Sequence, residues 1–119
     1  MSETDSSNLP ILDEDMIVEL RELMEEDFED LLDTFLRDMP LQLAKLEAAV
    51  ADDDAEKLWR AAHPLKSSSG SIGAMLLSAL AERMERYGRD GAAAKLKPLL
   101  VEIQAAAVQT RSAIQSLLL

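Results

Sequence analysis

The sequence contains no cysteine, a single histidine and few aromatic residues, which make up 3% of its 119 residues. Without cysteine the chain has no disulfide, no thiolate nucleophile and no cysteine zinc site, and one histidine alone makes no zinc site either. No apolar run reaches the roughly 18 residues that span a bilayer, and the acidic N-terminus is unlike a secretory signal. We therefore expect a soluble cytoplasmic protein that binds neither metal nor membrane.

Positive charge is also scarce. The chain has 12 Lys and Arg against 23 Asp and Glu, a net charge of −11. This balance argues against direct nucleic-acid binding, which depends on neutralising phosphates. The charge is unevenly spread, because residues 1–60 carry a net charge of −14 and residues 61–119 a net charge of +3. The acidic half either repels nucleic acid and keeps the chain soluble, or simply forms solvated helix faces.

The hydrophobic fraction of 48% and charged fraction of 29% are typical of one globular domain at this length. Residues 1–10 are polar and rich in helix breakers, so we predict a flexible tail there and a single domain over 11–119. Apolar residues then recur at spacings of three and four. They predict a helix after Asp13 that uses Leu20, Leu23 and Met24, and a long one from Phe28 to Val50 that Pro40 kinks.

The second half of the chain has the same period. We predict helices over about 55–69, with Asp54 as its cap, and over 75–87, with Met75, Leu76, Leu80 and Met84 turned inward. A turn at Gly88–Gly91 would follow, with a last helix from about Ala92 that has Pro98 in its second turn. No segment alternates with the period of a strand. The prediction is an all-α fold, an antiparallel four-helix bundle with a short additional N-terminal helix.

The sole histidine lies in the helix predicted over 55–69. If this segment is helical, His63, Lys66, Ser67 and Gly70 share one face, while Leu58, Ala62, Leu65, Ser69, Ile72 and Leu76 mark a different stripe suited to a core. The phase turns His63 to solvent, next to a cation and among small residues. A lone histidine is more often structural than functional, but this setting is the one a surface nucleophile needs.

The run Ala62-His63-Pro64-Leu65-Lys66-Ser67-Ser68-Ser69-Gly70-Ser71-Ile72-Gly73-Ala74 resembles the signature of histidine phosphotransfer (HPt) domains, the small helical carriers of multistep phosphorelays. Residues 20–36 resemble the family's entry into its first long helix, and residues 80–85 its helix after the phosphorylated one. The resemblance covers residues 12–116. It implies that His63 is the phosphoacceptor and that Lys66 stabilises phosphoryl oxygens. Glu85 is the candidate to orient the imidazole, with Glu82 as the substitute, unless both are ordinary solvated helix charges.

Four neighbours of His63 are candidates for contact with a partner. Trp59 is either a half-exposed contact or a core residue, and we favour the core. Pro64 either bends the helix or fixes how His63 is presented. Ser67 stands where many HPt domains have glycine, and its hydroxyl is a candidate donor to a phosphate oxygen. Gly70 marks either a close approach of the partner backbone or the end of the helix.

The resemblance implies a monomeric, stand-alone HPt protein that takes a phosphoryl group from the receiver domain of a hybrid sensor kinase. It would pass the group to the receiver domain of a response regulator. The chain has no nucleotide-binding motif, so we expect no kinase activity of its own, no cofactor, and magnesium only in the receiver domains. The alternative is an acidic helical adaptor that binds partner proteins without phosphotransfer.

Overall fold

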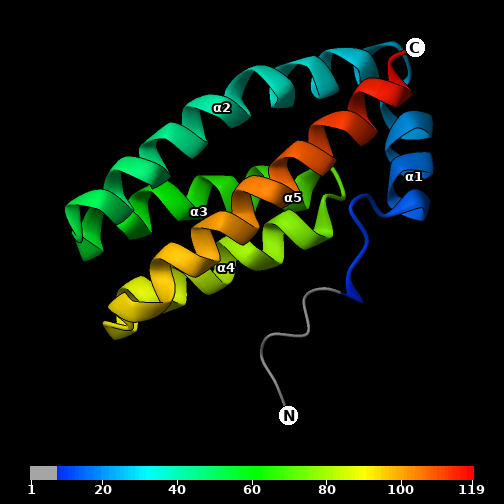
Figure 1. Cartoon of the computed structure of the whole chain (residues 1–119). Helices are drawn as coiled ribbons and strands as arrows, with labels where there is room; N and C mark the ends of the chain where they lie inside the picture. The colour runs from blue at the N-terminus through cyan, green and yellow to red at the C-terminus, as the bar shows by residue number, and fades with distance from the viewer. Residues whose placement is uncertain (1–7) are drawn as a thin grey trace.

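Four long helices make up most of the computed structural model, which describes residues 8–119 (Figure 1). A shorter helix precedes them, and no strand occurs in the described part of the chain. The all-α bundle with a short additional N-terminal helix is therefore confirmed. Its elements are α1 (Glu14–Met24), α2 (Phe28–Asp52), α3 (Ala55–Ser71), α4 (Met75–Asp90) and α5 (Leu96–Leu117), with single 3₁₀ turns at Glu25–Asp27 and Ala93–Lys95.

Two aspartates determine where α1 and α3 begin. The Asp13 side chain accepts a hydrogen bond from the backbone N–H of Met16 at 3.2 Å. The Asp54 carboxylate accepts from Glu56 N at 3.1 Å and Lys57 N at 3.2 Å. Each carboxylate satisfies N–H groups that have no partner inside the first helical turn. The cap at Asp54 and the start of a helix directly after Asp13 were both expected from the sequence.

The core lies between α2, α3, α4 and α5. α3 packs most extensively against α4 and also against α2, and α5 closes the bundle against α4 and α2. The stripe predicted for α3 is on the buried side, since Leu58, Ala62 and Leu65 are at most 1% exposed. The opposite face of α3 is thus left on the surface of the molecule.

The prolines inside α2 and α3 do not end these helices. α2 continues through Pro40 and α3 through Pro64. Both prolines are exposed, so water can reach the backbone carbonyls that lose an N–H partner. Pro98 is in the first turn of α5, where N–H groups have no helical partner in any case. α5 begins at Leu96, later than the expected Ala92, so Pro98 lies in its first turn and not in its second.

Other predictions were wrong in detail. Leu23 is 82% exposed, because α1 crosses only one end of the bundle and buries Ile17 alone. Gly88 is not in a turn but in α4, where it is buried against Leu58, and the chain reverses at Gly91 with φ of +75°. On α4, Leu77 is fully buried, while Met75 and Leu76 are only half-buried.

Backbone hydrogen bonds attach the N-terminal segment to the α3–α4 connection. Asp13 N donates to Gly73 O at 2.8 Å, and Leu76 N donates to Pro10 O at 3.1 Å. Gly73 has φ of +83°, a conformation that glycine adopts readily, and it forms the turn between the two helices. Of the predicted tail, residues 1–7 lie outside the described residues and Pro10 is anchored to α4.

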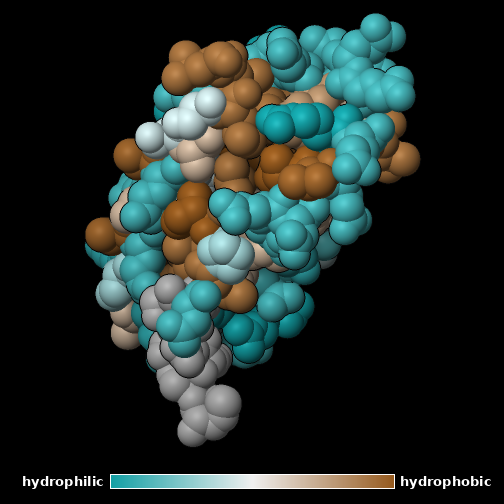
Figure 2. Space-filling view, turned by 90° about the vertical axis from the view of Figure 1, so that its right-hand side faces the viewer, coloured by the Kyte–Doolittle hydropathy of each residue, from teal (hydrophilic) through white to brown (hydrophobic). Residues whose placement is uncertain are grey.

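The surface at the α1 end of the molecule is mixed in character. α1 lies across this end, beside the C-terminus (Figure 1). Figure 2 shows the molecule from this end, where apolar patches interrupt a largely polar surface. Among residues 8–119, none of the helices is both long and apolar enough to cross a membrane.

Candidate functional site

His63 lies in the middle of α3 on the face turned away from the core. Its side chain is 48% exposed. Lys66 is half-buried one turn further along, and Ser67 is exposed beside it. The exposure predicted from helical phase is therefore confirmed.

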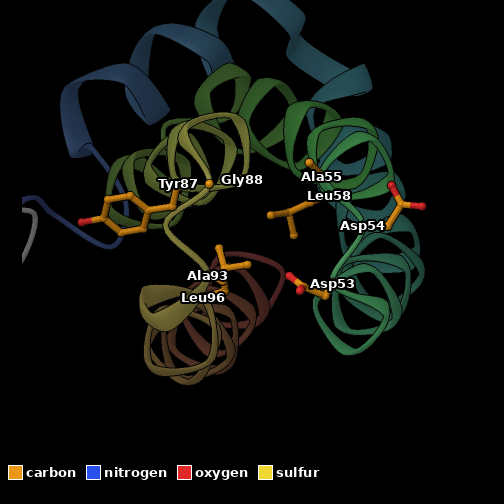
Figure 3. Close-up of a pocket in the computed structure, with 9 residues that line it drawn as sticks. Asp53, Asp54, Ala55, Leu58, Tyr87, Gly88, Ala93 and Leu96 are labelled. Carbon is orange, nitrogen blue, oxygen red and sulfur yellow. The ribbon is translucent and has the colours of Figure 1, made fainter.

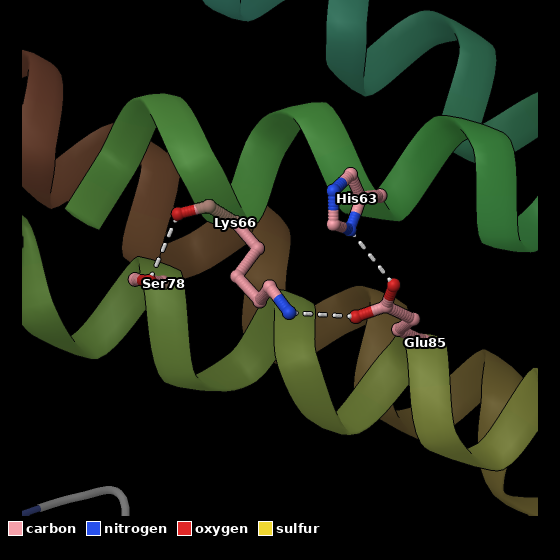
Figure 4. Close-up of polar contacts among 4 residues, drawn as sticks. All are labelled: His63, Lys66, Ser78 and Glu85. Atoms are coloured by element: carbon pink, nitrogen blue, oxygen red, sulfur yellow. Dashed lines mark hydrogen bonds and ion pairs between the residues drawn. The ribbon is translucent and has the colours of Figure 1, made fainter. Parts of the chain in front are cut away.

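A carboxylate from the neighbouring helix contacts both polar side chains of this face. Glu85 of α4 places Oε2 3.0 Å from Nδ1 of His63, and Oε1 accepts a hydrogen bond from Nζ of Lys66 at 3.0 Å (Figure 4). The Glu85 side chain is only 6% exposed. Its two oxygens therefore tie α4 to two residues of α3 at the surface of the bundle.

This contact determines which nitrogen of His63 carries the proton. An ionised carboxylate can only accept hydrogen bonds, so Nδ1 must be the protonated nitrogen that donates to Glu85. In the neutral imidazole, Nε2 then has the free lone pair. Nδ1 is thus paired with Glu85, and Nε2 is the ring nitrogen left with a lone pair.

Glu85 remains ionised in this position. Burial acts to raise its pKa, but the hydrogen bonds and charges of Lys66 and His63 outweigh burial and lower the pKa below the usual 4.5. The carboxylate is thus negative at neutral pH, and each of its oxygens is available to accept a hydrogen bond.

The backbone of α3 is held against α4 at the same level. Ser78 Oγ of α4 donates to the backbone carbonyl of Lys66 at 2.9 Å (Figure 4). A Cβ added at Gly70 would lie 3.3 Å from this hydroxyl. Gly70 is the penultimate residue of α3, which ends at Ser71, so the helix does end in this serine-rich stretch. The small size of Gly70 allows α4 to approach α3 closely, a role that was not expected.

Trp59 is not a core residue, contrary to our expectation. It is 41% exposed, and its ring stacks on that of His63 with the ring centroids 5.4 Å apart. The physical reason is helical phase: Trp59 precedes His63 by one turn and therefore shares its exposed face. Pro64 is also exposed next to His63.

The second candidate for the orienting carboxylate is placed differently. Glu82, one turn before Glu85 on α4, is exposed, and it is Glu85 whose oxygen lies against His63. Sequence reasoning did not identify Ser78 at all. No motif points to it, because its hydroxyl acts on a backbone carbonyl that any residue at position 66 would supply.

The described residues also enclose an open hollow of about 260 Å³ at the end of the bundle where α2 meets α3 and α4 ends (Figure 3). Asp53, Asp54, Leu58, Tyr87 and Gly88 are among its lining residues. His63, Lys66 and Glu85 do not line this hollow. With His63 48% exposed, their polar cluster lies on the surface of α3 and α4.

Comparison with known proteins agrees with this geometry. The family model described as Hpt domain matches residues 30–116. A crystal structure of histidine-containing phosphotransfer protein B (HptB) from Pseudomonas aeruginosa is 31% identical, with a TM-score of 0.86 over 90% of this chain and 93% of that chain. The HPT domain of a sensor hybrid histidine kinase from Shewanella has the same fold, with a TM-score of 0.77 at 18% identity over 91% of this chain and 93% of that chain. No curated protein matches the chain significantly.

The chain belongs to the Hpt domain family. It is a histidine phosphotransfer protein of phosphorelays, a class of phosphoryl carriers whose partners are receiver domains of hybrid kinases and response regulators.

Proposed function

We propose that His63 accepts a phosphoryl group on Nε2 from the phosphoaspartate of one receiver domain. It then passes this group to the aspartate of a second receiver domain. The observation that carries this role is the contact between Nδ1 and the buried carboxylate of Glu85. His63 is the only histidine in the chain, and it is exposed. A partner protein can therefore reach the one nitrogen that has a free lone pair.

The transfer balances without any cofactor in this chain. The Nε2 lone pair forms the N–P bond while the O–P bond to the aspartate breaks, and the electron pair returns to the aspartate carboxylate. Nδ1 keeps its proton, so the phosphorylated ring gains a positive charge opposite the negative Glu85. Lys66, already held on this face by Glu85, can turn toward the phosphoryl oxygens and stabilise the charge that develops there.

The remaining features of the reaction belong to the partners. The donor is the receiver domain of a hybrid sensor kinase and the acceptor that of a response regulator, and each supplies its own magnesium ion.

This chain acts as a monomer and does not phosphorylate itself from ATP. Ser67, with Trp59 and Pro64 beside it, forms the surface on which the receivers dock, because these residues are exposed around His63.

Labelled phosphate tests this function. ATP alone should not label the protein, whereas ATP with a hybrid kinase and its receiver domain should label it on His63. The label should be acid-labile and stable to base, as expected of a nitrogen-bound phosphoryl group. His63→Gln, a polar replacement without the nucleophile, should remain folded and unlabelled.

Two results would contradict the function. One is a labelled His63→Gln protein, and the other is an acid-stable label on Ser67, Ser68 or Ser69. A protein that no receiver domain labels, and whose cellular activity survives His63→Gln, would instead be an adaptor without phosphotransfer.

A further inference from the structure

The indole ring of Trp59 lies against one face of the His63 imidazole. The ring centroids are 5.4 Å apart and the ring planes differ by 18°. For rings this close to parallel, such a centroid distance describes an offset stack, a favoured arrangement of aromatic pairs. The stack is built into α3, because residues four apart lie on the same face of a helix.

The stack leaves the reacting atom free. The lone pair of Nε2 lies in the plane of the imidazole, whereas the indole covers part of a face. A phosphoryl donor that approaches Nε2 in the ring plane is therefore not blocked by Trp59. The indole instead limits how far the imidazole can tilt.

Trp59 and Glu85 restrain the imidazole in different directions. The hydrogen bond to Glu85 Oε2, 3.0 Å long, restrains the position of Nδ1. The indole restrains the plane of the ring, which one hydrogen bond at its edge controls only weakly. His63 is 48% exposed, so few other contacts are available to hold it. Together the two residues determine the direction in which Nε2 points.

The indole also suits the charge of the phosphorylated ring. When Nε2 forms its bond to phosphorus and Nδ1 keeps its proton, the imidazole ring becomes positive. The face of an indole attracts cations, and tryptophan does so most strongly among the aromatic residues. The stack is therefore stronger in the phosphorylated ring than in the neutral one, which favours transfer to His63.

We propose that Trp59 is a positioning residue for phosphoryl transfer, whose indole orients the imidazole of His63 and stabilises its positive phosphorylated form. This role rests on the proposed function of His63 and goes beyond contact with a receiver domain. A residue that only contacts the receiver would have no effect on a donor that lacks a protein surface.

A small phosphoramidate donor makes this distinction. Nε2 of His63 attacks its phosphorus, the P–N bond breaks, and ammonia leaves with a proton from solvent. We expect Trp59→Ala to slow this labelling threefold to tenfold, as loss of a stacked pair would. Trp59→Phe keeps an aromatic face and should stay within about twofold of the wild type. Arg60→Ala is the matched control, because Arg60 is the next residue of α3 and its side chain is 70% exposed.

A spectroscopic measurement checks the same contact. Trp59 is the only tryptophan in the chain, so all tryptophan emission comes from the indole that stacks on His63. Its emission should change when phosphoramidate labels His63, and it should not change in His63→Gln. Circular dichroism must show that Trp59→Ala is as helical as the wild type, which we expect because the residue is 41% exposed.

Three results would overturn the positioning role. The first is a Trp59→Ala protein that phosphoramidate labels at the wild-type rate, and the second is a Trp59→Phe protein that is labelled as slowly as Trp59→Ala. The third is tryptophan emission that does not change when His63 is labelled. If Trp59→Ala were slow only with a receiver domain, Trp59 would be a docking residue. Failure of the proposed function has a different signature, because wild-type protein would then take phosphate from phosphoramidate but from no receiver domain.

Discussion

Replacing Glu85 by glutamine removes the negative charge of the site carboxylate and nearly preserves its shape. Glutamine offers one oxygen acceptor and one NH₂ donor in place of two acceptor oxygens. The ammonium of Lys66 can only donate, so it should keep the oxygen, which leaves the NH₂ group facing Nδ1 of His63. Nδ1 must then accept, and the proton of the neutral ring moves to Nε2. In this tautomer Nε2 has no lone pair with which to attack.

The size of the effect follows from these two contacts. Loss of a partner that sets the histidine tautomer should slow phosphorylation of His63 on the order of tenfold to a hundredfold. The hydrogen bond to His63 is charge-assisted but half-exposed, so its loss should lower the free energy of unfolding by only about 1 kcal/mol. For a domain of this length that corresponds to roughly 3–6 °C in the unfolding midpoint.

The assay combines transfer rates with a direct view of the tautomer. Labelling by a receiver domain and by phosphoramidate gives the rate, and nitrogen NMR of the imidazole shows which nitrogen carries the proton. Glu82→Gln is the matched control, because it removes the same charge from an exposed position one turn earlier on α4. A wild-type rate in Glu85→Gln, or a proton that stays on Nδ1, would refute the reasoning. Equal slowing in Glu82→Gln would assign the effect to net charge and not to the contact.

Three further predictions concern packing, access and pH. In Gly88→Ala the new Cβ would overlap Cδ2 of the buried Leu58 and lie 3.1 Å from its Cγ. Figure 3 shows the Leu58 side chain pointing from α3 toward Gly88 of α4. We expect the cost of overpacking to exceed the gain in helix propensity, so chemical denaturation should show a free energy of unfolding lower by about 1–2 kcal/mol. A variant as stable as the wild type would mean that Leu58 moves aside freely. Ser67→Leu should slow phosphoryl transfer from a receiver domain, because Ser67 is exposed beside His63. It should change neither the rate of labelling by phosphoramidate nor the unfolding midpoint. An unchanged rate of transfer from the receiver domain would show that the receiver does not approach Ser67 closely. Because the pKa of Glu85 is lowered below 4.5, its contribution to stability is fully present above pH 4.5 and is lost as the pH falls through the lowered pKa. The difference in unfolding midpoint between wild type and Glu85→Gln should therefore shrink from pH 5 towards pH 3, and a difference that is constant with pH would contradict this linkage.

Local sequence was sufficient for the helices and for the exposure of His63. The period of apolar residues is a property of each helix alone, so it identifies the buried face of α3 and the opposite face that carries His63 and Lys66. The caps at Asp13 and Asp54 are equally local, since each side chain bonds to N–H groups within three residues. The exposure of Trp59 was also present in this pattern, because it is one turn from His63, but its apolar character led to the wrong prediction.

Only the tertiary structure decided how α4 meets α3. Glu82 and Glu85 are one turn apart on the same helix, and the rotation of α4 about its axis places Glu85 against His63 and Lys66. Likewise Gly88, read as a turn residue, is a point of close helix contact with Leu58. The period of apolar residues shows only which face of each helix is buried. The packing of side chains that are distant in sequence determines which atoms of two neighbouring helices touch.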